Sequence, residues 1–312
     1  MPILAPDQDI LTLPYHVDIH RYNNKQSRDK YMHSHLPESS QFKLIVSDVD
    51  ETLLNSKMVL EDFTVDVLRE LKRNNIGITF ATGRSYKSVT SLIDILEIKM
   101  PMVFANGAMI QDHDGKVLLS KTLKNELMIE IIKVCNHFNA DWMICYEKEI
   151  LVREINNNTG ITSEYNEPDP IRISDKVENL KKLNEPTKLI VVDRENPQKL
   201  RIVLDMLKEK MGDELNISFS LDIFLEIMPA GVSKLSGVKF VADSLGIDKN
   251  QIIAFGDGDN DAEMLGYVGL GIAVENASPK CKSYAKLVVG HHNEQGPANF
   301  LNQFYNLGIK NQ

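Results

Sequence analysis

The feature of this sequence that most restricts its fold is an alternation of short apolar segments with amphipathic helical patterns. Residues 43–50 and 76–84 have the apolar, β-branched character of buried strands, and helical patterns follow them at 61–75 and 85–98. The apolar segment 102–110 is predicted to form a third strand. A helix between two strands returns the chain to the same end of the sheet, so the strands run parallel and the crossovers are almost always right-handed. Ligand sites in such sheets lie at the carboxyl ends of the strands. An α/β fold with an open parallel sheet is therefore predicted.

The alternation is interrupted in the middle of the chain, where two helical patterns lie among short strand patterns separated by turn residues. This arrangement is typical of an antiparallel α+β unit. The strand–helix alternation then returns, with a helix from Ser233 and strands at 251–257 and 269–274. We therefore expect an inserted α+β domain at 124–228 that splits a core domain composed of residues 42–123 and 229–312.

The first 41 residues are expected to be a polar extension that precedes the folded body, because residues 14–41 lack a sustained hydrophobic period. Four histidines lie there, and we expect them to be solvated side chains rather than metal ligands: His16, His20, His33 and His35.

Charge and cysteine content exclude several classes of function. A net charge of -9 argues against nucleic acid or an anionic membrane as the main partner. The 3 cysteines have no metal-ligand spacing, which indicates reduced thiols rather than disulfides or a zinc site. The sequence contains neither an apolar run of about 20 residues nor a signal-peptide pattern, so a cytoplasmic protein is expected.

Acidic residues gather where two predicted strands end. Asp48 and Asp50 close the first strand, and Asp257, Asp259 and Asp261 crowd the loop after segment AFG. Carboxylates this close together are unfavourable unless a cation lies between them, and oxygen-rich clusters suit Mg²⁺ when a phosphate supplies further ligands. A calcium loop is a weaker interpretation, since the glycine and the terminal glutamate of an EF-hand are missing.

Two further strand ends carry groups that suit an oxyanion. Thr82, Gly83 and Arg84 supply a hydroxyl, an unobstructed backbone and a guanidinium, and Asn106 with Gly107 would place an amide donor. Each of these short motifs, taken alone, fits an ordinary turn equally well. Their coincidence with the acidic strand ends is what favours a phosphate site.

Lys234 occupies an unusual position in the first turn of the helix that Ser233 is predicted to cap. A cation there opposes the helix dipole at a cost of roughly 0.3–1 kcal/mol, so we expect it to face an anion. One arrangement accounts for all these residues: the acidic strand ends hold Mg²⁺, Thr82 and Lys234 bind a phosphoryl group, and Asp48 attacks phosphorus.

In this order the residues resemble the haloacid dehalogenase (HAD) superfamily of phosphotransferases. The matching motifs are DxDxT (Asp48, Asp50, Thr52), Thr82, Lys234 and GDxxND (Gly256, Asp257, Asn260, Asp261). The insert lies between the second and third motifs, as a C2-type cap does. The segments TGR, NGA, GDGDND and NASP are similar to the Cof-type branch of sugar-phosphate phosphatases. The resemblance covers about residues 42–307 and implies a Rossmann-like core.

The resemblance also implies roles for the site residues. Asp48 would be the nucleophile that forms an aspartyl-phosphate, and Asp50 would protonate the leaving oxygen and then activate water. Mg²⁺ would be held by the Asp48 carboxylate, the Asp50 backbone carbonyl and Asp257, with Asp261 and Asn260 in support. The implied substrate is a small phosphorylated metabolite, in particular a sugar phosphate. The implied phosphate-binding residues are Thr82, Gly83, Arg84, Asn106, Gly107, Lys234 and Asn260.

Three positions depart from the family pattern. Glu51 stands where Cof-type members usually have glycine, which adds a negative charge beside the site. Leu235 replaces a frequent glycine after the motif lysine, and Glu275 replaces the glycine usual before Asn276. None of these departures removes a catalytic group.

Other functions remain open from sequence. A phosphomutase would share this core and cap, a silent phosphate-binding protein could be built on the same fold, and a phosphoacceptor signalling module uses similar groups but is shorter. Substrate selection by the insert is unassigned. Its charged candidates are each expected to be solvated surface groups: Glu147, Arg153, Lys188 and Glu226.

Overall fold

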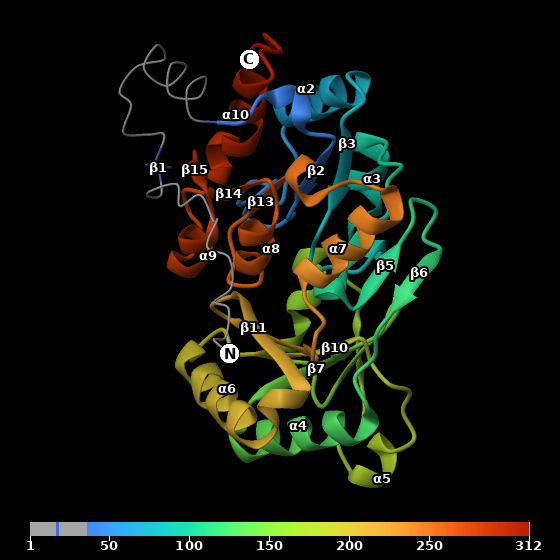
Figure 1. Cartoon of the computed structure of the whole chain (residues 1–312). Helices are drawn as coiled ribbons and strands as arrows, with labels where there is room; N and C mark the ends of the chain where they lie inside the picture. Colours follow the sequence, from blue (N-terminus) through green and yellow to red (C-terminus); the bar gives the residue numbers. More distant parts are fainter. Residues whose placement is uncertain (1–16, 19–35, 312) are drawn as a thin grey trace, which may run out of the picture.

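The computed structural model describes residues 17–18 and 36–311, which form a core domain and a smaller cap domain (Figure 1). The predicted α/β fold, with a parallel core sheet and an inserted α+β cap, is confirmed. The four N-terminal histidines that we expected to be solvated, together with most of the predicted extension, lie outside the described residues.

The core domain is built on a parallel sheet. Every hydrogen-bonded pair of strands in it runs in the same direction. All four residues of β2 and all five of β13 are buried, so these strands read as continuous apolar runs. The order across the sheet is β1 (Val17–Asp18), β15 (Leu287–Val289), β14 (Leu270–Val274), β13 (Ile252–Gly256), β2 (Leu44–Ser47) and β3 (Gly77–Phe80).

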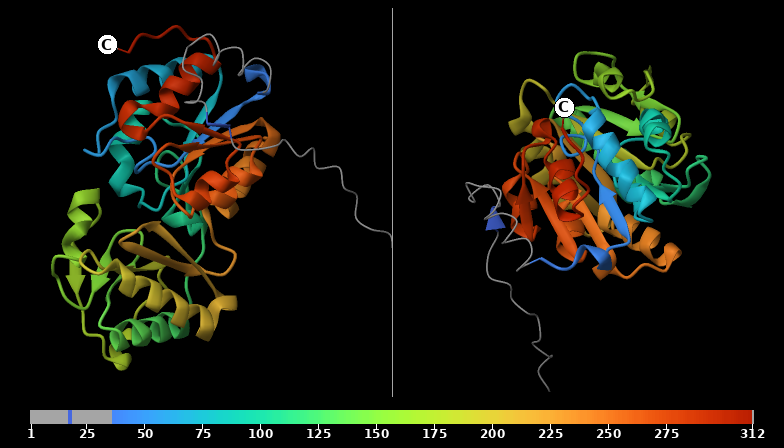
Figure 2. Two further views of the ribbon diagram at one scale, coloured as in Figure 1. Left: turned by 90° about the vertical axis from the view of Figure 1, so that its left-hand side faces the viewer. Right: turned by 90° about the horizontal axis from the view of Figure 1, so that it is seen from above.

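Helices cover both faces of this sheet (Figure 2). One face carries α2 (Asp62–Arg73), α3 (Thr90–Leu96) and α10 (Gly296–Phe304). The other carries α7 (Lys234–Leu245), α8 (Ala262–Tyr267) and α9 (Pro279–Tyr284). Contacts link α2 to α3 and α10, and α8 to α7 and α9. The predicted helix at 85–98 is shorter than expected, because a 3₁₀ turn precedes α3.

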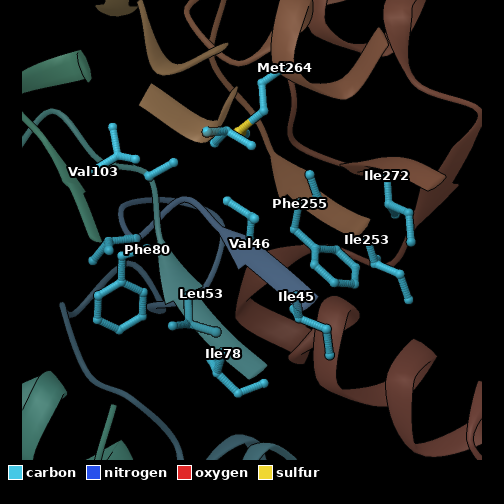
Figure 3. Packing of buried hydrophobic residues seen from close by; sticks show 14 of the residues in the cluster. Ile45, Val46, Leu53, Ile78, Phe80, Val103, Ile253, Phe255, Met264 and Ile272 are labelled. Carbon is cyan, nitrogen blue, oxygen red and sulfur yellow. The ribbon is translucent and has the colours of Figure 1, made fainter. Parts of the chain in front are cut away.

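Side chains from both faces pack into one hydrophobic cluster in the core domain (Figure 3). Ile45 and Val46 project to opposite faces of β2, and Ile253 and Phe255 share one face of β13, as the alternation along a strand requires. Phe255 meets Phe300 of α10 edge to face, with ring centroids 6.2 Å apart. Each fully buried side chain of this size contributes roughly 1.5–3 kcal/mol. The strand ends that precede Asp48 and Asp257 are thereby held by a packed core.

A small antiparallel sheet leads from the core domain toward the cap. It consists of β4 (Met102–Phe104), β5 (Met109–Gln111) and β6 (Val117–Ser120). The prediction of a single strand over 102–110 is therefore wrong. Ala105, Asn106 and Gly107 all have positive φ, so the chain reverses there and β5 pairs with β4.

The cap is a six-stranded sheet with helices against one face. Its strand order is β11 (Leu215–Leu221), β12 (Phe224–Pro229), β10 (Lys188–Val192), β7 (Asp141–Cys145), β8 (Ile150–Val152) and β9 (Pro170–Arg172). Only the β8–β9 pair is parallel. The helices are α4 (Asn125–His137), α5 (Val177–Leu180) and α6 (Pro197–Met211). Among the described residues of both domains, short 3₁₀ helices occupy 39–41, 87–89, 105–107, 159–165, 212–214, 249–251 and 292–294.

The two faces of the cap sheet have different surroundings. Helices α4 and α6 lie on the face turned away from the core domain, where they bury Trp142 and its neighbours (Figures 1 and 2). The opposite face carries a separate buried cluster that includes Met143, Ile150 and Phe224, and it is turned toward the core domain. Leu123 packs within the cap cluster and Met228 within the core cluster, so the chain changes domain close to these residues.

Two further expectations, on the cysteines and on membrane-spanning segments, can be compared with the structure. Cys135, Cys145 and Cys281 are free and buried, in line with reduced thiols. Within the described part of the chain, none of the helices has the length and apolar character needed to cross a membrane.

Candidate active site

The acidic residues come together at the carboxyl end of the parallel sheet. Asp48 directly follows β2, and its backbone N–H donates to the Phe255 carbonyl at the end of β13 (3.0 Å). Asp257 directly follows β13, and Thr52 donates its hydroxyl to the Asp257 carboxylate (2.7 Å). Because β2 and β13 are parallel neighbours, residues more than 200 positions apart in the chain meet at one point.

Asp48, Asp257 and Asp261 form a buried carboxylate cluster, with one oxygen of each within 4.8 Å of the others. Both oxygens of Asp261 are already engaged. One accepts from Lys234 (2.7 Å), and the other accepts from the backbone N–H groups of Asp257 (3.1 Å) and Gly258 (3.0 Å). Three carboxylates that face a single ammonium leave an excess of negative charge, and hard oxygen donors suit Mg²⁺. The residues therefore fit a divalent cation.

Lys234 provides the positive charge of this cluster. Its Nζ lies 2.7 Å from the carboxylates of both Asp48 and Asp261, and the side chain is 1% exposed. Ser233 caps α7 as predicted, since its hydroxyl accepts from the backbone N–H of Ser236 within a capping box. The expectation that the first-turn lysine faces an anion is confirmed for the Asp48 carboxylate.

Burial and mutual repulsion shift the titration of the cluster. The pKa of Asp48 is raised from 3.8 to about 7, chiefly by burial; Lys234 opposes the shift, and Asp261 adds to it. Burial and the Asp48 and Asp261 charges likewise raise the pKa of Asp257 well above its ordinary value. Burial lowers the pKa of Lys234, but the two carboxylates outweigh it and raise the pKa overall. Lys234 therefore stays protonated. A further cation would stabilise the ionised forms of Asp48 and Asp257.

Asp50 lies beside the cluster and is bound by an arginine. Arg84 donates from Nε (2.8 Å) and from one terminal nitrogen (2.5 Å) to the two Asp50 oxygens, which is the bidentate geometry that favours a carboxylate. Its other terminal nitrogen donates to the Tyr165 carbonyl of the cap (3.2 Å). The structure thus places the guanidinium, which we had predicted to bind phosphate, on the predicted acid–base residue.

The remaining predicted phosphate ligands lie around Asn106. The backbone N–H of Asn106 donates to the Thr82 carbonyl (3.0 Å), and its amide oxygen accepts from Asn260 (3.0 Å). The Asn106 Nδ2 is buried and has no hydrogen-bond partner among the described residues. An anion beside Gly83 would satisfy this donor. Gly107 serves packing instead, since a Cβ there would lie 2.1 Å from the Ser233 carbonyl oxygen.

Glu51, the departure from the family pattern, has a structural consequence. Its φ is +51°, in the left-handed region where glycine is favoured, and its side chain is exposed. The Glu51 carbonyl accepts from the Asn276 side chain (2.8 Å), which ties the loop after β2 to the NASP segment. The turn that a glycine usually makes is therefore retained by a glutamate.

A single pocket spans the two domains and includes the carboxylate cluster. Its walls contain Asp48, Asp50, Lys234 and Asp257 on the core side and residues of the cap sheet on the other. Three cap groups bind one core loop, Gly83–Ser85. Lys188 donates to the Gly83 carbonyl (2.8 Å), Tyr165 accepts from Arg84, and Glu167 accepts from the Ser85 backbone N–H (2.8 Å) and hydroxyl (2.6 Å).

Two of the four charged cap candidates contradict our expectation of solvated surface groups. Lys188 and Glu226 form a buried ion pair (2.7 Å) at 7% and 5% side-chain exposure, and both line the pocket. Glu147 also lines the pocket, whereas Arg153 lies outside it and binds Asn136 (3.2 Å). Sequence reasoning missed Tyr165 and Glu167 altogether.

A parallel sheet that holds a carboxylate cluster and a buried lysine at its strand ends, closed by an antiparallel cap, defines a capped α/β fold with a charged site between its two domains. The chain belongs to the haloacid dehalogenase-like hydrolase family, whose sequence profile matches residues 45–301. Within it, the chain is a Cof-like HAD phosphatase with a C2-type cap.

Known proteins extend this result over most of the chain. A candidate phosphatase of Haemophilus influenzae is 30% identical over 277 residues, which is 85% of this chain and 98% of that protein. A 5-amino-6-(5-phospho-D-ribitylamino)uracil phosphatase of Bacillus subtilis is 26% identical over 85% of this chain and 98% of its own length. The structure of a HAD subclass IIB sugar phosphatase matches 84% of this chain and 99% of its own with a TM-score of 0.73 at 20% identity, which shows the shared fold.

Proposed function

We propose that this protein is an Mg²⁺-dependent phosphatase that hydrolyses small phosphate monoesters through an aspartyl-phosphate intermediate. The observation that carries the proposal is the position of Asp48, whose carboxylate lies 2.7 Å from the buried Lys234 and faces the pocket between the domains. A carboxylate held beside a fixed cation is arranged to attack an electrophilic phosphorus, because phosphoryl transfer depends on positioning and on neutralisation of charge.

The protein's own residues account for both halves of the reaction. Asp48 forms a bond to phosphorus as the bond to the leaving oxygen breaks, and Asp50 gives that oxygen its proton. In the second half Asp50 takes a proton from water, and the water oxygen attacks the phosphorus and releases Asp48. Lys234 holds Asp48 in place and offsets charge on the phosphoryl oxygens. Two further donors are the Asn106 Nδ2, which has no partner among the described residues, and the Thr82 hydroxyl, whose oxygen accepts from the Arg84 backbone N–H (3.2 Å).

Arg84 has two tasks in this scheme. In the structure it pairs with both Asp50 oxygens, which suits Asp50 as a base but not as an acid. We propose that the guanidinium moves to the phosphoryl oxygens when substrate binds, which frees Asp50 to carry a proton. This gives Arg84 the phosphate-binding role predicted from sequence as well as the contact seen in the structure.

The residues that would hold Mg²⁺ are Asp48, Asp257 and the Asp50 backbone carbonyl, with Asp261 and Asn260 as supports. Asp261 acts here through Lys234 and through the backbone of the 257–258 loop, since its oxygens are already occupied by these donors. A bound Mg²⁺ would neutralise charge on the transferring phosphoryl group.

The substrate is proposed to be a small phosphorylated metabolite, with sugar phosphates as the first class to examine. The family resemblance and the sugar phosphatase with the same fold support this choice. The Bacillus subtilis relative adds a phosphorylated ribitylamino-uracil as a second candidate. We further propose a cytoplasmic enzyme that does not act on nucleic acid or at membranes, in line with its net charge of -9.

The proposal is tested by phosphate release from p-nitrophenyl phosphate and a panel of sugar phosphates, with Mg²⁺ or with EDTA. We expect metal-dependent release that Asp48→Asn abolishes, because the amide cannot form the aspartyl-phosphate. Isomerised sugar phosphate without release would instead indicate a phosphomutase. Binding without either reaction would indicate a silent phosphate-binding protein and overturn the proposal.

A further inference from the structure

The pocket that contains the carboxylate cluster is also lined by aromatic side chains from both domains. On the core side Tyr86 and Phe104 meet edge to face, with centroids 5.7 Å apart. On the cap side Tyr165 and Phe224 meet in the same way, also at 5.7 Å. All four residues line the pocket, and the Arg84 guanidinium lies over the Tyr165 ring, 5.5 Å from its centroid. Aromatic rings pack against one another with more energy than burial alone supplies.

The rest of this wall is largely apolar, and its two buried charges, Lys188 and Glu226, are paired. Met143, Ile150 and Ile190 contribute aliphatic surface from the cap sheet. Lys188 and Glu226 neutralise one another. A leaving group that was only a polyol would lose water from several hydroxyls here, and each unpaired buried hydroxyl costs about 1–3 kcal/mol.

Two buried polar atoms on the pocket walls indicate a small number of specific contacts. The Gln111 side-chain oxygen and the Thr162 hydroxyl have no hydrogen-bond partner among the described residues, and both side chains are at most 3% exposed. Gln111 is held by its amide nitrogen, which donates to the Gly115 carbonyl (3.0 Å). Its free oxygen is an acceptor, so the matching ligand atom is a donor.

The charge of the cap wall limits the ligand further. Glu147 and Glu167 line the pocket, and their recorded hydrogen bonds are to the neutral groups of Gln111 and Ser85. An additional anion on the leaving group would therefore meet like charge across a largely apolar pocket, which is unfavourable.

We infer that the alcohol released by this enzyme carries a flat aromatic ring, uncharged or cationic, with a hydrogen-bond donor on its rim. The inference rests on the proposed phosphatase function. The arm between the ring and the phosphate can be a sugar, so the inference narrows the sugar-phosphate proposal. The phosphate lies at the Asp48 end of the pocket, and the ring lies between the two aromatic pairs.

The test compares benzyl phosphate with cyclohexylmethyl phosphate, two esters of similar size whose uncharged rings differ in flatness and aromatic character. We expect kcat/KM to be about three- to tenfold higher for benzyl phosphate, from the energy of aromatic pairing. Ribose 5-phosphate should be a poorer substrate than benzyl phosphate, and so should 4-carboxybenzyl phosphate, which adds an anion to the ring.

A pair of variants assigns the preference to the pocket. Phe224→Leu removes one aromatic wall, and the ratio of kcat/KM for benzyl to cyclohexylmethyl phosphate should fall to about one. Phe219→Leu makes the same change on β11, at a half-buried side chain outside the pocket, and should leave the ratio as it is. An equal fall in both variants would show a general effect on the cap and overturn the assignment.

The results separate the two proposals. Equal kcat/KM for the benzyl and cyclohexylmethyl esters, or a higher value for ribose 5-phosphate than for benzyl phosphate, overturns the aromatic subsite while the phosphatase stands. A higher value for the 4-carboxybenzyl ester overturns the charge preference. Absence of phosphate release from every ester, p-nitrophenyl phosphate included, overturns the phosphatase proposal itself.

Discussion

The core and cap domains each bury a lysine against a carboxylate, but the surroundings of the two lysines differ. In the core, Lys234 lies between two carboxylates of an acidic cluster that has excess negative charge. In the cap, Lys188 and Glu226 form one neutral pair in a mainly apolar wall. The core thus concentrates charge around Asp48, whereas the buried charges of the cap cancel one another. The proposed chemistry lies in the core, and the proposed ring site lies between the two domains.

The largest expected effect is the loss of unfolding free energy when either buried lysine is replaced. Lys234→Met leaves the buried Asp48 and Asp261 without their cation, and Lys188→Met leaves Glu226, so each should cost about 3–5 kcal/mol of unfolding free energy. The single tryptophan, Trp142, is buried in the cap, so its fluorescence follows the cap while circular dichroism follows the whole chain. Lys188→Met should shift the fluorescence transition more than Lys234→Met does.

The control for that measurement is the double variant Lys188→Met/Glu226→Leu. Replacement of both partners of a buried ion pair by apolar groups is often close to neutral, so most of the lost stability should return. If the double variant is as unstable as the single one, the cap pair contributes packing rather than charge balance, and the contrast between the domains weakens.

The next effect tests the residue that contacts both domains. Arg84→Met removes the bidentate contact to Asp50 and the donor to the Tyr165 carbonyl. We expect kcat/KM for p-nitrophenyl phosphate to fall about 10²-fold, as misplacement of a catalytic group does. A fall in kcat alone would assign Arg84 to Asp50, a rise in KM alone would assign it to phosphate, and the proposed double role requires both. Arg84→Lys should restore phosphate affinity more than kcat.

A smaller effect concerns the pH dependence of the core cluster without metal. The pKa of Asp48 is about 7 in the folded chain and 3.8 unfolded, so between these values the folded state binds the extra proton. Stability contributed by this group therefore falls as pH rises from about 4 to 7, by at most about 1.4 kcal/mol per pH unit. Asp48→Asn should lack this contribution, which the difference between the two proteins in EDTA would measure by thermal unfolding.

Mg²⁺ provides the matched condition for the pH measurement. A bound cation favours the ionised form of Asp48, so the difference in slope between the parent protein and Asp48→Asn should disappear when Mg²⁺ is present. A slope difference that persists with saturating Mg²⁺ would show that the cluster does not bind the metal. Lys188 and Glu226 are not among the proposed metal ligands, so their contribution to the unfolding free energy should be the same with Mg²⁺ and with EDTA.

The smallest expected effect is at Glu51 of the core. Because its φ is +51°, Glu51→Gly should raise the unfolding free energy by up to about 1 kcal/mol. Glu51→Ala removes the charge but keeps the Cβ, so it should not share the gain. Equal stabilisation by both substitutions would show that charge, and not backbone conformation, sets the cost of this departure from the family pattern.

The core site could be predicted from sequence because a parallel sheet brings strand ends together. Asp48 and Asp257 each end an apolar run, so the fold rule placed them at the same edge of the sheet, and the pairing of β2 with β13 makes them neighbours. Lys234 followed from a local conflict with the helix dipole, which a nearby anion resolves. These inferences needed no knowledge of register, since the carboxyl ends of neighbouring parallel strands coincide.

The cap required information that the sequence carries only weakly. Glu226 stands between apolar residues in a buried strand, a position that could have marked it as paired, but the partner depends on register. β10 and β12 align Ile190 with Glu226, so Lys188 lies on the neighbouring diagonal. Tyr165 and Glu167 lie in or beside a 3₁₀ segment that reads as a polar loop. The Asn106–Gly107 reversal was visible as a turn signal inside an apolar run.

The pairing of β2 with β13 also sets the order in which the chain can fold as it is synthesised. β2 ends at Ser47, whereas its partner begins at Ile252, after the entire cap. The cap is contiguous in sequence, so a growing chain completes it while one side of β2 still has no neighbour. Until β13 is made, that edge is an apolar strand open to other chains. About the last fifth of the chain, which begins at Ile252, must therefore be synthesised before this edge of β2 can be covered.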